Sequence, residues 1–283
     1  MALSEHGIYQ HWSDNVARNA TLTADPDSGS PADETYGPDA LVDDNPAKVA
    51  KIDATTGAWI EDFGEAQRVD LVGLIHHDFD EGADVRIQAA DSLSDFTSSP
   101  ASPDFDAAIT IPPWLGSGSR LWPVNPWLDL TTQPGYSATG WRYWRLVVTG
   151  NSQNLQLGQL WLSPTIRRFD PDVRWGVTRA PRRLYAKSTT VFEVDNFVSR
   201  SSRRWSQIGD LLPEQALADA LEIQWDDVDG AVLPWLLVPD GAVNNCYLVR
   251  WDQPDRPLQF VAPGIYATQI KVIEAARGLR PGV

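Results

Sequence analysis

The chain has 283 residues and a net charge of −15, and its 42% hydrophobic and 22% charged residues are typical of a folded globular protein. The charge is uneven: residues 1–165 carry 8 basic and 23 acidic residues, whereas residues 166–283 carry 15 of each, and this asymmetry indicates two modules. The sequence excludes an intrachain disulfide framework, because Cys246 is alone, and it shows neither a membrane-spanning apolar run nor a signal-peptide pattern.

Short apolar runs separated by turns predict a β-sandwich in the first half. Residues 19–47 are rich in Pro, Gly, Asp and Ser, which favour turns. The strand patterns lie at residues 58–64, 68–77, 83–90, 141–148 and 154–164. The alternation of apolar residues predicts a core that includes Val72, Leu74, Val85 and Ile87. Residues 91–139 are expected to be mostly loop, because proline interrupts them throughout.

The second half is predicted to be mostly β with one helix. We expect an arginine-rich connector over residues 166–187 and a strand over residues 188–197. The helix is predicted within residues 211–230, with Asp210 as N-cap. Further strands are predicted at residues 233–239, 245–252, 257–264 and 266–278. The predicted fold is therefore mainly β, with one domain at residues 1–165 and a second at 166–283.

Five motifs in the first half occur in the order found in one family. They are "ALVDDNP" (40–46), "AWIEDFG" (58–64), "RVDLVGL" (68–74), "VRIQAADSLSDF" (85–96) and the closing "GWRYWRLVVTGNSQNLQLGQLWLSP" (140–164). This run resembles the galactose-binding-like, or discoidin (F5/8 type C), jelly-roll sandwich. The resemblance implies a fold rather than an activity, because this fold hosts many unrelated functions.

Calcium-binding members of that family use an Asp-Asn loop and a glutamate in the last strand. The resemblance therefore implies a calcium site at Asp44 and Asn45. Gln159 stands where the glutamate is expected, and a site poor in carboxylates holds calcium weakly. The alternative is an Asx turn that Asp and Asn make with their own backbone. We expect no cofactor.

Sugar-binding members of the family use exposed aromatic residues with Arg or His at loop tips. The candidates for glycan contact here are His76, His77, Trp114, Trp122 and Trp127. The alternative is that these tryptophans pack the long loop onto the sandwich or onto a neighbouring subunit.

The adjacent pair His76 and His77, followed by Asp78 and Asp80, also raises the question of a metal or acid–base site. Adjacent strand residues point to opposite faces, so both histidines cannot easily ligate one ion. No H-x-H, H-E-x-x-H, C-x-x-C, G-x-S-x-G or P-loop pattern occurs. Paired carboxylates are abundant, but a glycosidase needs them across a cleft. We therefore expect no enzymatic activity, and we expect both histidines to mark the start of a solvated acidic loop.

The stretch 166–204 is basic and interleaved with aromatic residues. Arg and aromatic residues are enriched in protein interfaces, so we predict an interface. Its residues are Arg174, Trp175, Arg182, Arg183, Arg203 and Arg204. The alternatives are contact with DNA, or salt bridges to the acidic first module of the same or another copy. The acidic first half itself argues against binding of nucleic acid, whose phosphates need cations.

The layout from residue 191 onward is a strand pair, a helix, a "PWLLVPD" strand and a closing "QIKVIEA" strand. It looks like minor tail proteins of long-tailed bacteriophages that carry a tail-tube or distal-tail module. This resemblance implies a structural component of the tail tip or baseplate, assembled in the host cytoplasm into the virion tail. The implied partners are the tail tube, hub and tape-measure proteins, in a trimeric or hexameric ring, with the sandwich bracing neighbours or touching host-surface glycan. The alternatives are a stand-alone carbohydrate-binding module protein and, third, a glycan hydrolase.

Overall fold

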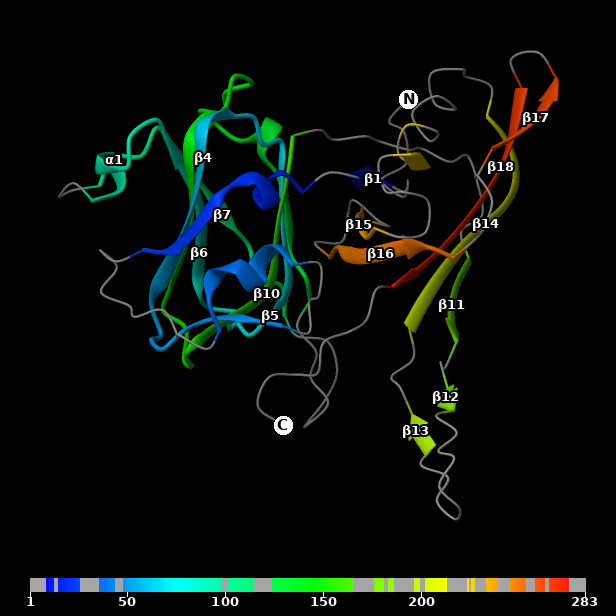
Figure 1. Cartoon of the computed structure of the whole chain (residues 1–283), viewed down its shortest axis with the longest axis horizontal. Helices are drawn as coiled ribbons and strands as arrows, with labels where there is room; N and C mark the ends of the chain where they lie inside the picture. Colours follow the sequence, from blue (N-terminus) through cyan, green and yellow to red (C-terminus); the bar gives the residue numbers. More distant parts are fainter. Residues whose placement is uncertain are drawn as a thin grey trace. The chain divides into compact units, whose positions relative to one another are not determined.

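The computed structural model describes residues 9–12, 15–25, 36–43, 48–97, 101–113, 124–164, 176–180, 183–185, 196–198, 202–212, 223, 225–226, 233–238, 245–252, 258–262 and 265–274. These residues fall into two compact units (Figure 1). One lies within Met1–Asp170 and Trp235–Leu248, and the other within Pro171–Pro234 and Val249–Arg277. Both consist of antiparallel strands, so the predicted mainly-β fold is confirmed. No helix in these ranges is long and apolar enough to cross a membrane.

The first unit is a sandwich of two antiparallel sheets, as the spacing of apolar runs predicts. The five-stranded sheet has the order β2-β4-β9-β6-β7. Its strands are β2 (Thr21–Ala24), β4 (Gly57–Gln67), β9 (Trp141–Thr149), β6 (Asp84–Ala90) and β7 (Phe105–Ile109). The four-stranded sheet has the order β3-β10-β5-β8. Its strands are β3 (Ala50–Ile52), β10 (Leu155–Ser163), β5 (Leu71–His77) and β8 (Trp127–Asp129).

A single apolar core lies between the two sheets. The four residues predicted for it, Val72, Leu74, Val85 and Ile87, are all buried there. Trp59, Trp141 and Trp144 are the largest side chains of this core, and all three are buried. Each removes a large apolar surface from water, at about 25 cal/mol for every Å².

Short helical turns connect the strands of the sandwich. They are η1 (Val16–Asn19), η3 (Pro38–Val42), α1 (Ser94–Thr97) and η5 (Leu130–Thr132). The side chains of Asn15 and Asp129 cap η1 and η5 by accepting backbone hydrogen bonds. The described part of residues 91–139 is mostly loop, as predicted, although α1, β7, β8 and η5 also lie there. The strand β7 carries a clear alternation of buried and exposed residues in "FDAAI" that the prolines around it masked.

The segment Trp235–Leu248 belongs to the same compact unit as the sandwich. Its strand β15 (Trp235–Val238) pairs with β1 (Tyr9–Trp12). The backbone N–H of Cys246 donates to the Asn125 carbonyl at 2.8 Å, and Asn125 Nδ2 donates to the Cys246 carbonyl at 3.1 Å. A Cβ atom on Gly73 of β5 would lie 3.1 Å from Leu236 Cδ2 and 3.5 Å from Cys246 Sγ. This segment therefore packs on the outer face of the four-stranded sheet.

The second unit is built around two long strands, β14 (Ser202–Leu212) and β18 (Ile265–Glu274). They pair antiparallel from Arg204↔Ile273 to Leu212↔Tyr266. The strands β11 (Gly176–Ala180) and β17 (Leu258–Ala262) pair with β14 and β18 respectively. The strand β16 (Tyr247–Trp251) runs across the division between the units and pairs with β18 through Val249–Trp251.

The strands predicted at 245–252, 257–264 and 266–278 are confirmed as β16, β17 and β18. Two other predictions are wrong. The expected connector at 166–187 contains β11 and β12 (Arg183–Tyr185). Asp210 is no helix cap, because it pairs with Thr268 within β14. Residues 223 and 225–226 are helical; the rest of the predicted helix, and most of the predicted strand 188–197, lie outside the described residues.

Candidate binding site

The two histidines at the end of β5 have different environments. His77 is 2% exposed: its Nε2 donates to the Val124 carbonyl at 2.8 Å, and its Nδ1 accepts from the Phe79 backbone N–H at 3.1 Å. Both ring nitrogens are thus occupied, and burial lowers the pKa of His77 to about 4. The buried ring stacks on Phe79 and supports this loop end, so it does not offer the ligand contact expected of it.

His76 is half-buried and has a φ of 56°, in the left-handed region that few residues other than glycine adopt. Its backbone N–H donates to Asn125 Oδ1 at 3.0 Å, which stabilises this conformation. His76 lies one residue before the end of β5, and the pairing with β10 continues to Leu157↔His77 before the chain enters the following loop.

The sequence predicted a solvated acidic loop after His77, but most of this loop is hydrogen-bonded to the sandwich. The Asp78 carboxylate accepts from the Gln156 backbone N–H at 2.9 Å. The Asp80 carboxylate accepts from the Ser152 N–H at 2.6 Å, and the Asp80 N–H donates to Asn151 Oδ1 at 2.8 Å. Burial raises the pKa of Asp78 to about 7. Only the tip, at Glu81 and Gly82, is exposed.

The remaining candidates are not brought together. Trp127 lies half-buried in β8 opposite Gly73. Arg183 lies in β12, and Arg203 and Arg204 lie in β14. The other candidates lie outside the described residues: Trp114, Trp122, Asp44, Asn45, Arg174, Trp175 and Arg182. In the described part of the chain, no group of three or more His, Cys, Asp or Glu side chains is arranged to hold a metal ion.

Glu61 is a buried carboxyl inside the sandwich. It lies in β4 opposite Trp144 and Leu22, and neither carboxyl oxygen has a hydrogen-bond partner among the described residues. Burial raises the pKa of Glu61 well above its ordinary value. Burial therefore favours the protonated form of this carboxyl, which belongs to the core rather than to a site open to ligand.

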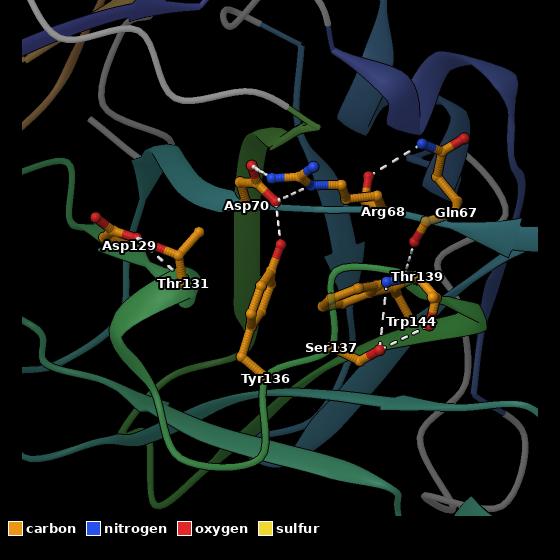
Figure 2. A network of polar contacts seen from close by, with 9 residues as sticks. All are labelled: Gln67, Arg68, Asp70, Asp129, Thr131, Tyr136, Ser137, Thr139 and Trp144. Carbon is orange, nitrogen blue, oxygen red and sulfur yellow. Dashed lines mark hydrogen bonds and ion pairs between the residues drawn. The ribbon is translucent and has the colours of Figure 1, made fainter.

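A polar network at the opposite end of β5 joins the β4–β5 loop to the segment between β8 and β9 (Figure 2). Arg68 forms a bidentate pair with Asp70, with Nε to Oδ1 and Nη2 to Oδ2 both at 2.7 Å. The Tyr136 hydroxyl donates to the same Asp70 Oδ1. The Asp70 side chain is 4% exposed, whereas that of Arg68 is 48% exposed. The buried carboxylate thus fixes an arginine whose outer edge faces solvent.

The backbone around the network is held from two sides. The Asp70 N–H donates to the Ser163 carbonyl at 2.7 Å, and the Asp70 carbonyl accepts from the Leu130 N–H at 2.8 Å. Gly140, with a φ of 77°, approaches the neighbouring turn so closely that a Cβ there would lie 2.2 Å from the Gln67 carbonyl oxygen. Only glycine fits at this position, and it brings the loop after Tyr136 against Gln67 and Arg68.

Hydroxyl-bearing side chains line the rim of this network. Thr131 donates to Asp129 Oδ1, and the hydroxyls of Ser137 and Thr139 lie 2.7 Å apart (Figure 2). Thr131 and Thr139 are exposed. We name the Arg68, Asp70 and Tyr136 network together with these residues the arginine site.

The environment of the arginine site affects the pKa values of Arg68 and Tyr136. Hydrogen bonding to Asp70 raises the pKa of Arg68, and burial followed by the bond to Asp70 raises the pKa of Tyr136 to about 12. The tyrosine therefore remains a protonated donor. Pairing with Asp70 uses two of the five N–H groups of the guanidinium, which leaves donors that can reach a ligand beside the Tyr136 ring.

The sequence did not indicate this site. Arg68 and Asp70 are close in the chain, but Tyr136 is 66 residues away and lies in the stretch expected to be loop. The only signal was the charge pair in "RVD", at the start of the predicted strand 68–77.

Comparisons with known proteins give similarities of structure only. No protein-family model matches the chain, and no curated protein sequence does. A lectin domain of lectinolysin complexed with Lewis B antigen has a TM-score of 0.37 at 12% identity, over 54% of this chain and 97% of that one. A fucose-binding module of Streptococcus pneumoniae has a TM-score of 0.37 at 15% identity, over 54% and 96%. A fucolectin from striped bass (Morone saxatilis) serum has a TM-score of 0.38 at 16% identity, over 57% and 50%. These similarities are too low to support any conclusion beyond the two-sheet sandwich, which the strand order of this chain defines by itself.

Proposed function

We propose that the sandwich of this chain is a carbohydrate-binding module and that the arginine site contacts the sugar. The observation that carries the proposal is the half-exposed Arg68 guanidinium, held in place by the buried Asp70 carboxylate. Planar, pre-oriented donors suit neighbouring sugar hydroxyls because their geometry is fixed before binding. The Tyr136 ring supplies a flat apolar surface beside them, and the threonines add adaptable donors and acceptors.

The proposal is tested by screening the full chain on a glycan array and measuring Kd for the best ligand by calorimetry. Arg68→Ala should weaken binding at least tenfold, which corresponds to about 1.4 kcal/mol. Tyr136→Phe keeps the ring and should weaken it less. Arg86→Ala is the matched control, since Arg86 forms an equivalent surface pair with Asp106 at 2.8 Å in β6 and β7.

Circular dichroism of each variant shows whether the fold is kept. A glycan that binds the Arg68→Ala protein as tightly as the original chain would place the site elsewhere. Absence of binding to any glycan on the array would remove the proposed function.

A role as a structural subunit of a bacteriophage tail tip is our second proposal, and it concerns the second unit. The long antiparallel pair β14–β18, together with β16 and β17, supports it, because extended β modules can assemble into rings. Electron microscopy of the purified chain, alone and with a tail-tube protein, tests it. Discrete rings are expected, and separate particles of one chain under both conditions would contradict it.

A further inference from the structure

The second unit contains a two-stranded extension. β11 pairs with β14 from Gly176↔Ser206 to Ala180↔Ser202. β12 then pairs with β13 (Asn196–Val198) from Arg183↔Val198 to Tyr185↔Asn196, in the same antiparallel sense (Figure 1). We name β11, β12, β13 and the Ser202–Ser206 part of β14 the hairpin arm.

Most of the hairpin arm lacks a third strand. β18 pairs with β14 only from Arg204 onward, and β12 and β13 form a separate two-stranded sheet among the described residues. Two-stranded ribbons are marginally stable in water. Their edges also present unpaired N–H and C=O groups. A surface that covers the arm would therefore stabilise it.

The charge of the arm indicates the chemistry of that surface. The strands of the arm carry four basic residues, Arg179, Arg183, Arg203 and Arg204, and no acidic one, and the whole segment 176–206 has a net charge of +5. The register places Arg179 opposite Arg203. Like charges at opposed positions weaken strand pairing, and an anionic partner would relieve this repulsion.

The sandwich provides such an acidic surface. Residues 1–165 have a net charge of −15. Its cations are largely neutralised within the sandwich, as shown by the ion pairs Lys48–Asp43, Arg68–Asp70, Arg86–Asp106, Arg142–Asp62 and Arg145–Asp25. The acids that remain at the surface therefore dominate its field.

Four exposed acids of the sandwich lie around one edge of the five-stranded sheet. β7 is the last strand of that sheet in the described order, and its outer side has no partner strand there. The exposed acids around it are Asp84, Asp91, Asp104 and Asp106; Asp84 and Asp106 share the single cation Arg86, so the edge is net negative. We name β7 and these four residues the acidic edge.

We propose that the hairpin arm of one copy docks on the acidic edge of a second copy, so that the chain associates with itself. The opposite charges of the arm and the acidic edge favour association. The unpaired edge of β7 can add the arm as a further strand pair. The association is independent of carbohydrate binding, because the arginine site lies on other loops.

Sedimentation velocity of the full chain tests this, at about 50 mM and about 500 mM salt, since the attraction between exposed charges is screened at high ionic strength. The original chain should self-associate at low salt and at least tenfold more weakly at high salt. An arm variant combines Arg179→Glu, Arg183→Glu and Arg203→Glu. An edge variant combines Asp84→Lys, Asp91→Lys and Asp104→Lys. Each variant alone should remain monomeric.

Mixing the two variants gives the decisive result. The arm variant now carries a negative arm and the edge variant a positive edge, so these two surfaces should bind each other and restore association. A contact within a single chain cannot do this. A control with Arg250→Glu and Lys271→Glu, outside the arm, should behave as the original chain.

Three outcomes would overturn the proposal. They are a monomeric original chain at low salt, an arm variant that still associates, and a mixture that stays monomeric while both variants are folded by circular dichroism. Nucleic acid that co-purifies with the original monomer and is lost in the arm variant would assign the arm to a different partner.

Discussion

The two sheets of the sandwich share one core but differ on their outer faces. In the five-stranded sheet, β6, β7 and β9 alternate buried residues with exposed or half-buried ones. In the four-stranded sheet, β5 and β10 are buried at nearly every position. The outer face of β5 includes Leu71 and Ile75, which are 0% and 1% exposed although both lie outside the central core.

The difference follows from what lies against each face. Leu236 and Cys246 contact the outer face of the four-stranded sheet at Gly73, and the Arg18 guanidinium lies over the Trp161 ring. The five-stranded sheet instead carries surface ion pairs such as Arg86–Asp106 and Arg142–Asp62. Strict alternation therefore marks a face that meets water, and its loss marks a face that another segment covers.

The largest expected effect comes from a charge placed on the covered face. Ile75→Asp buries an unpaired carboxylate and should lower the free energy of unfolding by about 4 kcal/mol or more, or prevent folding. Val147→Asp puts the same group on the half-exposed outer face of β9 and should cost about 1 kcal/mol. Urea denaturation measures both. Equal effects would show that the two faces do not differ as described.

The next largest effect is a pH dependence from His77 on the covered face. Its folded pKa of about 4 lies below the unfolded value near 6.5, so the unfolded chain binds the proton first. Stability that is present above pH 6.5 should fall by up to about 3 kcal/mol as the pH drops to 4. His77→Gln should make the fall in Tm between pH 7 and pH 4 smaller than in the original chain. An unchanged slope would mean that His77 is not buried in the neutral form.

Gly73→Leu tests directly whether the segment 235–248 packs against β5. The added side chain meets Leu236 and Cys246 and should cost about 1–3 kcal/mol by overpacking. Gly82→Leu is the control, because a Cβ at Gly82 meets no atom within 4 Å, and it should change the Tm little. A neutral Gly73→Leu would show that the segment 235–248 does not press on β5.

The smallest expected effect lies just beyond the covered strand, at Asp78. Its folded pKa of about 7 exceeds the ordinary value of 3.8, so the folded chain holds the proton more tightly. The contribution of this group to stability should therefore be present below pH 4 and be lost as the pH rises to 7. Asp78→Asn keeps an acceptor for the Gln156 N–H and should gain about 1–2 kcal/mol over the original chain at pH 8. Equal stabilities at pH 8 would contradict this.

The sequence predicted those features that depend on local pattern. The strand β6 was recovered because Val85, Ile87 and Ala89 alternate with polar residues. The strands of the second unit from β16 onward were recovered from apolar runs between turn residues. The core residues Val72 and Leu74 followed from the same alternation.

Features that depend on distant segments escaped prediction. The burial of His77 requires the Val124 carbonyl, and the cover over Gly73 comes from residues after 234. The arginine site requires Tyr136 to contact Asp70, which lies 66 residues earlier in the chain. The spacing of apolar residues along one strand does not specify which distant segments will contact it.

The late position of the covering segment has a consequence during synthesis. When Ser163 completes the four-stranded sheet, the ribosome has yet to make the 72 residues that lead to Trp235. At about 5–20 residues per second this takes on the order of 4–14 seconds. During that interval the outer face of β5 at Gly73 lacks the cover that Leu236 and Cys246 provide, and such an apolar surface is suited to chaperone capture. A gene truncated after residue 165 would make this transient exposure permanent.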